Sequence, residues 1–373
     1  MITSFDDYCI HQTAQPIAQP SQSDRNFYDR YWFNGFDADA CYMFEIGFGL
    51  YPNRRVMDGH FSVTIGCRQF AFHASRRAPK ERADTAVGPL RVEVIEPLRK
   101  VRVVLEPNEH RIECDLVFTA ASAPHEEPPN VMYDDGHLIM HTSRFTQMGY
   151  WSGYFSVDGQ RFEVSDDYGT RDKSWGVRPV GEPPGGAPGL MNAEPGVYWV
   201  WCPLNFGDVC THFGTFEDRD GKPTQVSADL LPLYDDVAAI PAQESGVVPM
   251  RDISHQIQWV PGTRRAAGAQ LRLHDASGRA YDIALAPVGC VHYMLGIGYN
   301  HAQWGHGCWK GELATAREEW DLTAVNPLEY PFIHNHQIVR ATMGDRIGFG
   351  VLETIVIGRH APSGFKDFFD GAP

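Results

Sequence analysis

The stretch Asp166–Pro179 holds three acidic and three basic side chains together with a Tyr and a Trp. Within it, Asp172, Lys173 and Trp175 are the residues that could carry chemistry. A lysine in an apolar cavity has a lowered pKa and can move a proton, and a neighbouring aspartate can orient it or balance its charge. The same residues could instead form a buried ion pair that closes the end of a barrel, with Trp175 as ordinary core.

Histidines form a second candidate group. Its members are His301 and His306, which flank Trp304 in a glycine-rich stretch, and the His-x-His pair of His334 and His336. On a strand, both rings of such a pair lie on one face. With His212 or Glu353 the group could bind a metal ion, act as general acid or base, or supply hydrogen-bonded positions around a cavity. We expect no metal, and assign His306 to acid/base chemistry and His336 and Trp304 to substrate binding.

Polar side chains also interrupt a β-rich segment that contains Arg144, Gln147 and Trp151. An Arg or Gln that points into an apolar barrel is costly unless it is hydrogen-bonded, so these residues are either exposed or part of a polar site. We assign all three to substrate binding. Arg171 and Arg178 are expected to pin corners of the chain rather than to hold a substrate.

Strand patterns dominate the elements that must position these residues. Apolar and polar residues alternate with period two along Ile112–Phe118 and Arg91–Val94, while Cys41–Tyr51 and His60–His73 are β-rich without a helical stripe. Glycine-containing pairs that predict hairpin turns follow such runs at Asp158-Gly159, Asp220-Gly221 and Ser277-Gly278. The sequence therefore predicts an all-β fold.

Helical signals are sparse. Thr315–Ala324 fits either a short helix or an extended edge, Gln243–Asp252 fits a loop, and the aromatic run Asp24–Phe33 fits a plug for a barrel or the mouth of a cavity. Helices and strands do not alternate, which argues against a doubly wound α/β fold. Nucleotide-binding glycine loops and the serine-hydrolase elbow are also missing from the sequence.

Glycine and proline suggest the domain boundaries. The chain has 36 Gly and 26 Pro among 373 residues, and Pro179–Gly196 gathers many of them into a run that predicts a linker or a long loop. We favour the linker. This divides the chain into an N-terminal aromatic segment (1–40), a first β domain (41–180) and a second β domain (196–373).

Charge and cysteine usage limit partners and location. The net charge is −15, from 32 Lys+Arg against 47 Asp+Glu, which disfavours nucleic acid as a partner. The acidic N-terminus lacks a signal-like basic region, and no apolar run is long enough for a membrane helix. We therefore expect a cytoplasmic protein without membrane insertion, whose eight scattered cysteines are reduced. A homodimer stays open.

Several motifs resemble those of the carotenoid 1,2-hydratase/AttH-like group. The group carries an Asp-His-x-Trp signature at the end of a strand, and Asp172–Trp175 matches it with a lysine in the histidine position. Tyr198–Trp201 resembles the aromatic strand that follows the signature. Tyr299–Glu312, Gly348–Glu353 and Ile357–His360 extend the resemblance, which points to an uncharacterised bacterial branch of the group.

The resemblance implies two lipocalin-like β-barrel or sandwich halves, and barrels of this size hold one small ligand. The group includes hydratases, pericyclic cyclases and proteins of unknown role. The aromatic content of this chain favours a hydrophobic aromatic or terpenoid ligand, held by Trp175 and Trp201 together with the binding residues assigned above.

We accordingly expect a lyase that needs no cofactor. Adding or removing water at a carbon–carbon double bond requires an acid, a base and a dry pocket, which Asp172, Lys173, Tyr198 and His306 could supply. The same groups could expel formaldehyde from a hydroxymethyl phenolic compound, as in aromatic-compound catabolism. The alternatives are a non-catalytic carrier of an apolar ligand and a metal-dependent isomerase or hydrolase.

Overall fold

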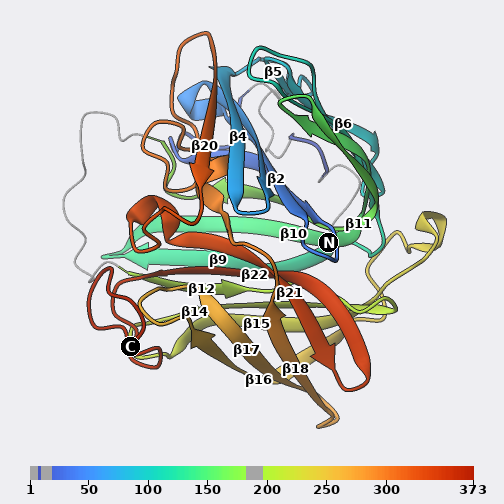
Figure 1. Cartoon of the computed structure of the whole chain (residues 1–373), viewed down its shortest axis with the longest axis vertical. Coiled ribbons are helices and arrows are strands. Elements are labelled where there is room, and N and C mark those ends of the chain that lie inside the picture. Colours follow the sequence, from blue (N-terminus) through green and yellow to red (C-terminus); the bar gives the residue numbers. More distant parts are fainter. Residues whose placement is uncertain (1–6, 10–18, 182–195) are drawn as a thin grey trace.

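The computed structural model describes residues 7–9, 19–181 and 196–373, which form two antiparallel β-sheets packed one above the other (Figure 1). The predicted all-β fold is confirmed. The helical elements of these residues are short 3-10 segments: η2 (Pro52–Arg54), η3 (Val237–Ala239), η4 (Met294–Ile297) and η5 (Tyr330–Phe332). None of the helices in the described residues is long and apolar enough to span a bilayer.

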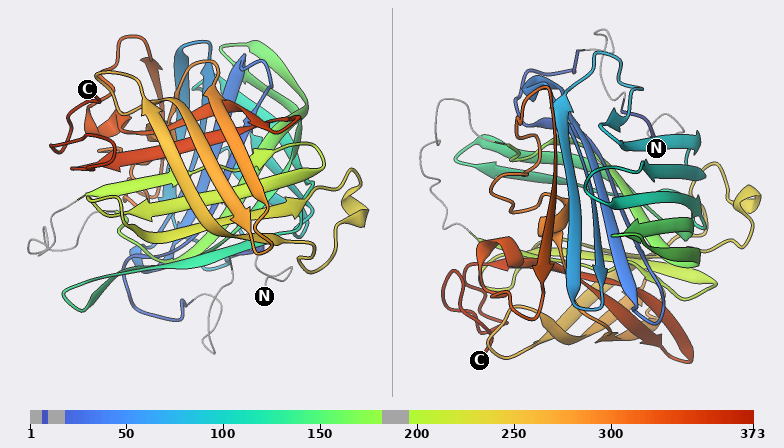
Figure 2. Two further views of the ribbon diagram at one scale, coloured as in Figure 1. Left: turned by 90° about the horizontal axis from the view of Figure 1, so that it is seen from below. Right: turned by 45° about the horizontal axis from the view of Figure 1, so that its top comes forward.

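The first sheet has twelve strands. They are β1 (Phe27–Phe36), β2 (Tyr42–Tyr51), β3 (Val56–Ile65), β4 (Arg68–Arg77), β5 (Ala86–Val87), β6 (Leu90–Glu96), β7 (Lys100–Leu105), β8 (Ile112–Ala120), β9 (His125–Asp134), β10 (His137–Val157), β11 (Gln160–Val177) and β20 (Leu313–Asp321). The spatial order is β20-β4-β3-β2-β1-β11-β10-β8-β7-β6-β5, and β9 pairs with β10. The second view of Figure 2 shows β20, from late in the chain, beside β4 at the edge.

The second sheet has ten strands. They are β12 (Val197–Trp201), β13 (Leu204–Asn205), β14 (Val209–Glu217), β15 (Pro223–Pro232), β16 (Val248–Trp259), β17 (Ala266–Asp275), β18 (Ala280–Pro287), β19 (His292–Tyr293), β21 (His334–Met343) and β22 (Arg346–Ile357). The pairings β12–β14, β12–β22 and β21–β22 close this sheet into a barrel, which the first view of Figure 2 shows from below.

Burial along the strands explains why some of them show alternating apolar and polar residues in the sequence and others do not. Strand β8 alternates buried and half-buried residues as predicted, because only one of its faces meets the core. All ten residues of β1 are buried. Its Tyr31 and Phe33 enter the core of the first sheet, whereas Trp32 packs on Trp201 of the second sheet. A strand covered on both faces shows no alternation, and the aromatic run around it forms a sheet strand rather than a plug.

Other local expectations can be compared with the strands. The three predicted glycine turns lie between β10 and β11, β14 and β15, and β17 and β18. At Asp158-Gly159 both residues have positive φ, 52° and 86°, which suits a tight hairpin. Thr315–Ala324 belongs to the extended edge β20 and its following turn, not to a helix, and β16 begins at Val248, inside the stretch expected to be a loop.

The predicted linker falls mostly on residues 182–195, which lie outside the described residues, as do residues 1–6 and 10–18 of the predicted N-terminal segment. The proposed division into domains therefore stays a prediction.

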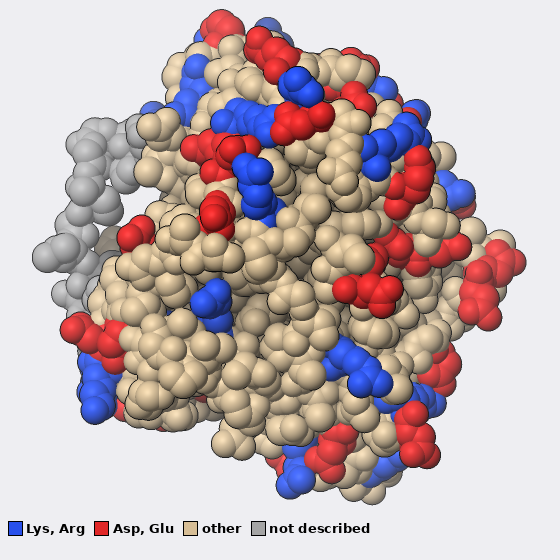
Figure 3. All heavy atoms as spheres, viewed as in Figure 1, with Lys and Arg blue, Asp and Glu red and all other residues tan. Residues whose placement is uncertain are grey.

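On the face drawn in Figure 3, acidic and basic side chains lie next to one another rather than in separate areas of one sign.

The cysteines depart from expectation at one pair. Cys67, in the turn after β3, forms a disulfide with Cys290, which precedes β19, across 223 residues of sequence. The other six cysteines form no disulfide. The expectation that every cysteine is reduced is wrong for this pair, because strands far apart in sequence bring the two side chains together.

We predict that the unreduced, denatured protein exposes six titratable thiols and that reduction raises the count to eight. Peptide mapping without reductant should recover the Cys67–Cys290 cross-link. A count of eight before reduction would contradict the pairing.

Candidate functional site

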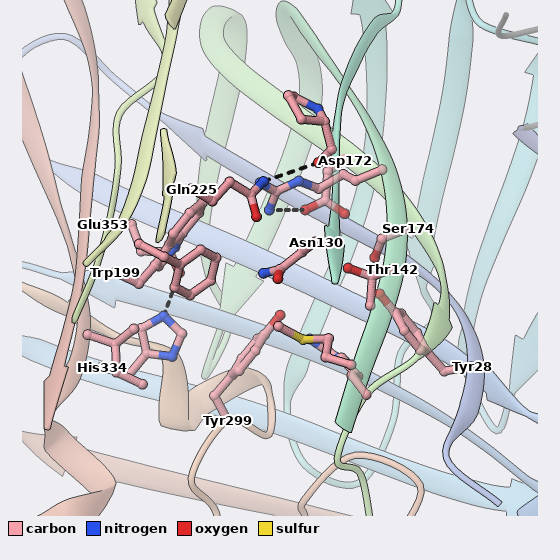
Figure 4. A pocket seen from close by; sticks show the side chains of 16 residues that line it. Tyr28, Asn130, Thr142, Asp172, Ser174, Trp199, Gln225, Tyr299, His334 and Glu353 are labelled. Atoms are coloured by element: carbon pink, nitrogen blue, oxygen red, sulfur yellow. Dashed lines mark hydrogen bonds and ion pairs between the residues drawn. The ribbon is translucent and has the colours of Figure 1, made fainter. Parts of the chain in front are cut away.

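A cavity of about 200 Å³ lies between the two sheets. Its apolar wall includes Met140, Trp199, Phe216 and Ile355. Its titratable wall includes Arg144, Asp172, Arg178, Tyr299, His334 and Glu353 (Figure 4). An apolar space with a few convergent polar groups is the usual form of a small-molecule site.

Strand pairing determines which side chains of the first sheet face this cavity. Paired residues of adjacent strands point to the same face, so Ser174 of β11 aligns with Arg144 of β10. Asp172, two residues earlier, shares that face. Lys173 lies between them and points to the opposite face. The period of two therefore separates the neighbouring Asp and Lys of the predicted motif.

Asp172 is a titratable group on the side of the cavity that the first sheet forms. Its carboxylate oxygen lies 3.9 Å from the Arg144 guanidinium, and its side chain is 13% exposed. Burial raises the pKa of Asp172 to about 7, and Glu127 adds to this rise although Arg144 opposes it. Asp172 can therefore exist as an acid or as a base near neutral pH.

Glu353 and His334 lie on the opposite wall, contributed by β22 and β21 (Figure 4). His334 Nε2 is 2.6 Å from Glu353 Oε1. Burial raises the pKa of Glu353, but the charge of His336 and the hydrogen bonds of both histidines lower it well below the usual range. With Nε2–H donating to an anionic Glu353, a neutral His334 keeps its Nδ1 lone pair free, and Nδ1 has no hydrogen-bond partner among the described residues.

His336 stands behind this pair between two carboxylates. Its Nδ1 is 2.5 Å from Glu45 Oε1, and its Nε2 is 3.5 Å from Glu353 Oε2. Burial lowers the pKa of His336, but the two glutamate charges outweigh it and raise the pKa to about 10. A cationic His336 thus joins β2 of the first sheet to β22 of the second.

A metal ion could bind at this wall. The ligand atoms of His334, His336 and Glu353 lie within 4.8 Å of one another. Glu45 Oε1 lies 2.5 Å from His336 Nδ1, which places a carboxylate behind this histidine as in carboxylate–histidine metal sites. To bind a metal, the cationic His336 would have to lose the proton on Nε2. Two histidines and a carboxylate with an open side fit a divalent ion such as zinc.

A second cluster, of His73, His301 and Glu318, is a poorer fit. His301 Nδ1 accepts the backbone N–H groups of Gln303 and Trp304, at 3.0 and 2.9 Å. A neutral His301 must then carry its proton on Nε2, where it donates to Glu318. That nitrogen is not free for a metal.

Lys173 is buried inside the first sheet. It forms an ion pair with Asp29 of β1, and its Nζ lies 4.9 Å from the centre of the Tyr31 ring. Trp175 lies near it, with its ring centre 5.8 Å from the Lys173 amine. The structure does not bring either residue to the lining of the cavity between the sheets.

Tyr198 is likewise turned away. Its ring packs in the core of the second barrel, stacked on His360 at 3.8 Å, and its hydroxyl is 3.0 Å from His255 Nε2. Burial raises its pKa. The next residue, Trp199, faces the cavity instead.

His306 lies one layer behind the cavity. Its Nδ1 accepts from Arg178 at 3.1 Å, and its Nε2 donates to the Ile297 carbonyl at 2.9 Å. Burial lowers the pKa of His306 well below its usual range, and Arg30 and Arg178 lower it further. His306 is therefore a neutral hydrogen-bonding residue at neutral pH.

The predicted binding residues divide into three positions. Arg144 lines the cavity, while Trp201 and His336 contact residues that line it, Arg144 and Glu353 respectively. Further from the cavity, Trp304 stacks on His73, Trp151 donates to the Asn34 carbonyl inside the first core, and Gln147 accepts from Arg171.

Sequence reasoning gave no site role to several residues that shape this cavity. Tyr28 and Tyr299 appeared only inside motifs. His334 appeared in the histidine group with metal, acid/base and hydrogen-bonding alternatives, and Glu353 appeared as a metal candidate. The sequence did hold a usable clue, because alternate residues of β11 and of β12 face opposite sides of the sheet. Choosing Asp172 with Trp199, rather than Lys173 with Tyr198, required knowing which face the second sheet covers.

We predict that Asp172→Asn stabilises the protein at about pH 8. The folded pKa of about 7 exceeds the ordinary aspartate value, so the folded state loses stability as pH rises toward 7. Removing the titration should restore on the order of 2 kcal/mol at pH 8 and much less near pH 5. Unfolding in urea at both pH values measures this. Asp166→Asn, an exposed position on the same strand, should change neither value. Destabilisation by Asp172→Asn at pH 8 would contradict the assignment.

Solved structures with a similar fold include a putative AttH from Nitrosomonas europaea, at 13% identity and a TM-score of 0.52, covering 88% of this chain and 92% of that one. CghA follows at 10% identity and a TM-score of 0.51, covering 89% and 88%. Kievitone hydratase from Nectria haematococca has 11% identity and a TM-score of 0.45, covering 88% of each chain. At 10–13% identity, the likeness to the AttH and CghA structures concerns the fold alone.

Sequence comparison gives a narrower result. Among curated proteins none matches this chain. A family model described as a family of unknown function, DUF8625, matches residues 2–366. Because the match spans nearly the whole chain, the protein belongs to the DUF8625 family.

Proposed function

We propose that this protein is a lyase that acts on a hydrophobic small molecule by acid/base chemistry in the cavity between the sheets. The observation that carries the proposal is the position of Asp172, with a pKa of about 7, across one cavity from the hydrogen-bonded pair of His334 and Glu353. Two titratable groups on opposite sides of an apolar space are what a proton-transfer reaction requires.

The roles follow from the proton positions. In a dehydration, His334 Nδ1 removes a proton from carbon, and the resulting imidazolium is stabilised by Glu353. Protonated Asp172 donates to the leaving hydroxyl, which departs as water while the C–H electron pair forms the double bond. Hydration is the reverse. Both directions need the partial protonation of Asp172 that its raised pKa provides.

The apolar wall favours an aromatic or terpenoid substrate, because Trp199 and Phe216 offer flat surfaces. Expulsion of formaldehyde from a hydroxymethyl phenolic compound suits the same pair of groups: a base takes the alcohol proton, formaldehyde leaves, and the ring accepts the electrons. This proposal uses Asp172 and His334, with Lys173, Tyr198 and His306 outside the reacting pair.

Location and assembly extend the proposal. We retain a cytoplasmic location and a substrate as the principal partner, and leave a homodimer open. The Cys67–Cys290 disulfide belongs to a type that persists mostly in oxidising compartments. Fractionation of the native cell is therefore the relevant test of location.

A second candidate function is a metal-dependent isomerase or hydrolase. It is favoured by the grouping of His334, His336 and Glu353 with Glu45 behind His336. A carrier without turnover would use the same cavity. The two experiments below separate these functions from the lyase.

The first experiment measures turnover. Panels of hydroxylated and unsaturated aromatic and terpenoid compounds, incubated with the protein, are followed by mass spectrometry for gain or loss of water or formaldehyde. We expect Asp172→Asn and His334→Ala each to lower the rate by roughly 100-fold or more, because each removes one proton-transfer group. Asp166→Asn is the matched control and should retain full activity. Full activity in both site variants would contradict the proposal, and binding without turnover would favour the carrier.

The second experiment removes metals. The acid/base reaction should proceed at an unchanged rate after dialysis against a chelator, because the protons move between Asp172, His334 and the substrate. Elemental analysis accompanies the rate measurement. Loss of turnover on chelation, with recovery on adding zinc, would favour the metal-dependent candidate.

A further inference from the structure

We propose that Arg178 forms an anion subsite in this cavity, which holds a delocalised oxyanion of the substrate, either a carboxylate or an acidic phenol or enol. The inference rests on the proposed function only in taking the cavity between the sheets as the substrate site. It adds the chemical class of the substrate: an apolar body that carries one acidic oxygen group.

The partners of Arg178 carry the argument. Its guanidinium lies 4.6 Å from the centre of the Tyr28 ring and 5.6 Å from that of Tyr299, and it donates to His306 Nδ1 at 3.1 Å. Within residues 7–9, 19–181 and 196–373, no carboxylate lies within 4 Å of it. All these partners are uncharged.

The other arginines beside the cavity are different. Arg144 pairs with Glu127 and lies 3.9 Å from Asp172, and Arg30 lies 3.8 Å from Asp58. A buried charge is costly without a partner, so buried arginines are usually paired in this way. Arg178 is half-buried, and it is the cavity-lining cation without a carboxylate within 4 Å among the described residues. Its charge acts on Asp172 and Asp58 only from further away, and its Nε has no hydrogen-bond partner among the described residues.

The surroundings of Arg178 hold it in place for a ligand. His306 accepts from Arg178 because its own Nε2–H is engaged by the Ile297 carbonyl. The Tyr299 ring packs edge-on against His306, with centres 4.4 Å apart. A guanidinium fixed in this way loses little freedom when it binds an anion, and its planar fork suits a carboxylate or another delocalised oxyanion.

The charges around the cavity favour one orientation of the ligand. Figure 4 shows Tyr28 on the side of the cavity away from His334 and Glu353. An anionic group at Arg178, beside Tyr28, stays clear of the anionic Glu353 while the apolar body extends along Trp199 and Phe216. Like charges repel, so a substrate turned the other way, with its anionic group at Glu353, is disfavoured. Asp172 also lines the cavity, and its charge opposes anion binding as the pH rises past about 7.

The test is calorimetric titration with two pairs of probes at about pH 8. Trans-cinnamate and cinnamamide have nearly the same size and differ in charge; 4-nitrophenolate and 4-nitroanisole form the phenol pair. We expect at least one anion to bind the wild type about tenfold more tightly than its neutral analogue, as a charged hydrogen bond would give. Preference for cinnamate alone assigns a carboxylate, and preference for the phenolate alone assigns an acidic phenol.

Variants locate the effect. Arg178→Gln should bind the charged and neutral probes equally, and Arg178→Lys should keep part of the preference. Arg340→Gln, at an exposed position, is the matched control and should keep all of it. Equal binding of the charged and neutral probes by the wild type, binding of none of them, or a preference that survives in Arg178→Gln would each overturn the proposal.

Asp172→Asn separates this inference from the proposed lyase. That variant removes a group assigned to turnover and leaves Arg178 in place, so the anion preference should persist in it. Because Asp172 is largely ionised at pH 8, the loss of its charge should keep or increase this preference. If the wild type prefers the charged probes but shows no turnover, only the lyase proposal is contradicted. If the wild type shows turnover but binds charged and neutral probes equally, only the anion subsite is contradicted.

Discussion

The contact of His336 with Glu45 on one side and Glu353 on the other is the interaction on which the cavity depends. It joins a strand of the first sheet to a strand of the second, and the side chains of His336 and Glu45 are fully buried. Because Glu353 is held anionic by this contact, it can orient His334 on the cavity side. On the opposite wall, burial raises the pKa of Asp172 more than the charge of Arg144 lowers it, so Asp172 keeps a proton up to about neutral pH.

Local sequence patterns were sufficient for the fold class and failed at the site for a specific reason. The alternation of Ile112–Phe118 and the three glycine turns predicted strands and hairpins because each depends on neighbours in sequence. The pairing of His336 with Glu45 spans both sheets, and no local pattern reports it. The family signature placed Asp172 beside Lys173 in sequence, yet the pleat of β11 puts them on opposite faces.

The same pleat explains why a shared fold leaves the chemistry open. The core residues fill the interiors of the two sheets, while the cavity is built from the outer faces that the sheets turn toward each other. Side chains on those faces can change without disturbing either core. Structures at 10–13% identity can therefore share the architecture, and the function of this chain has to be argued from the residues of its own cavity.

The most direct test of this account is the titration of Asp172 itself. Carbon-13 labelling of the aspartate carboxyls, with Asp172→Asn to assign the signal, would follow its chemical shift across the pH range by NMR. We expect a midpoint at about pH 7 for this one carboxyl. A midpoint at the ordinary aspartate value, about 4, would show that Asp172 does not keep its proton in the cavity and would contradict its role as the acid.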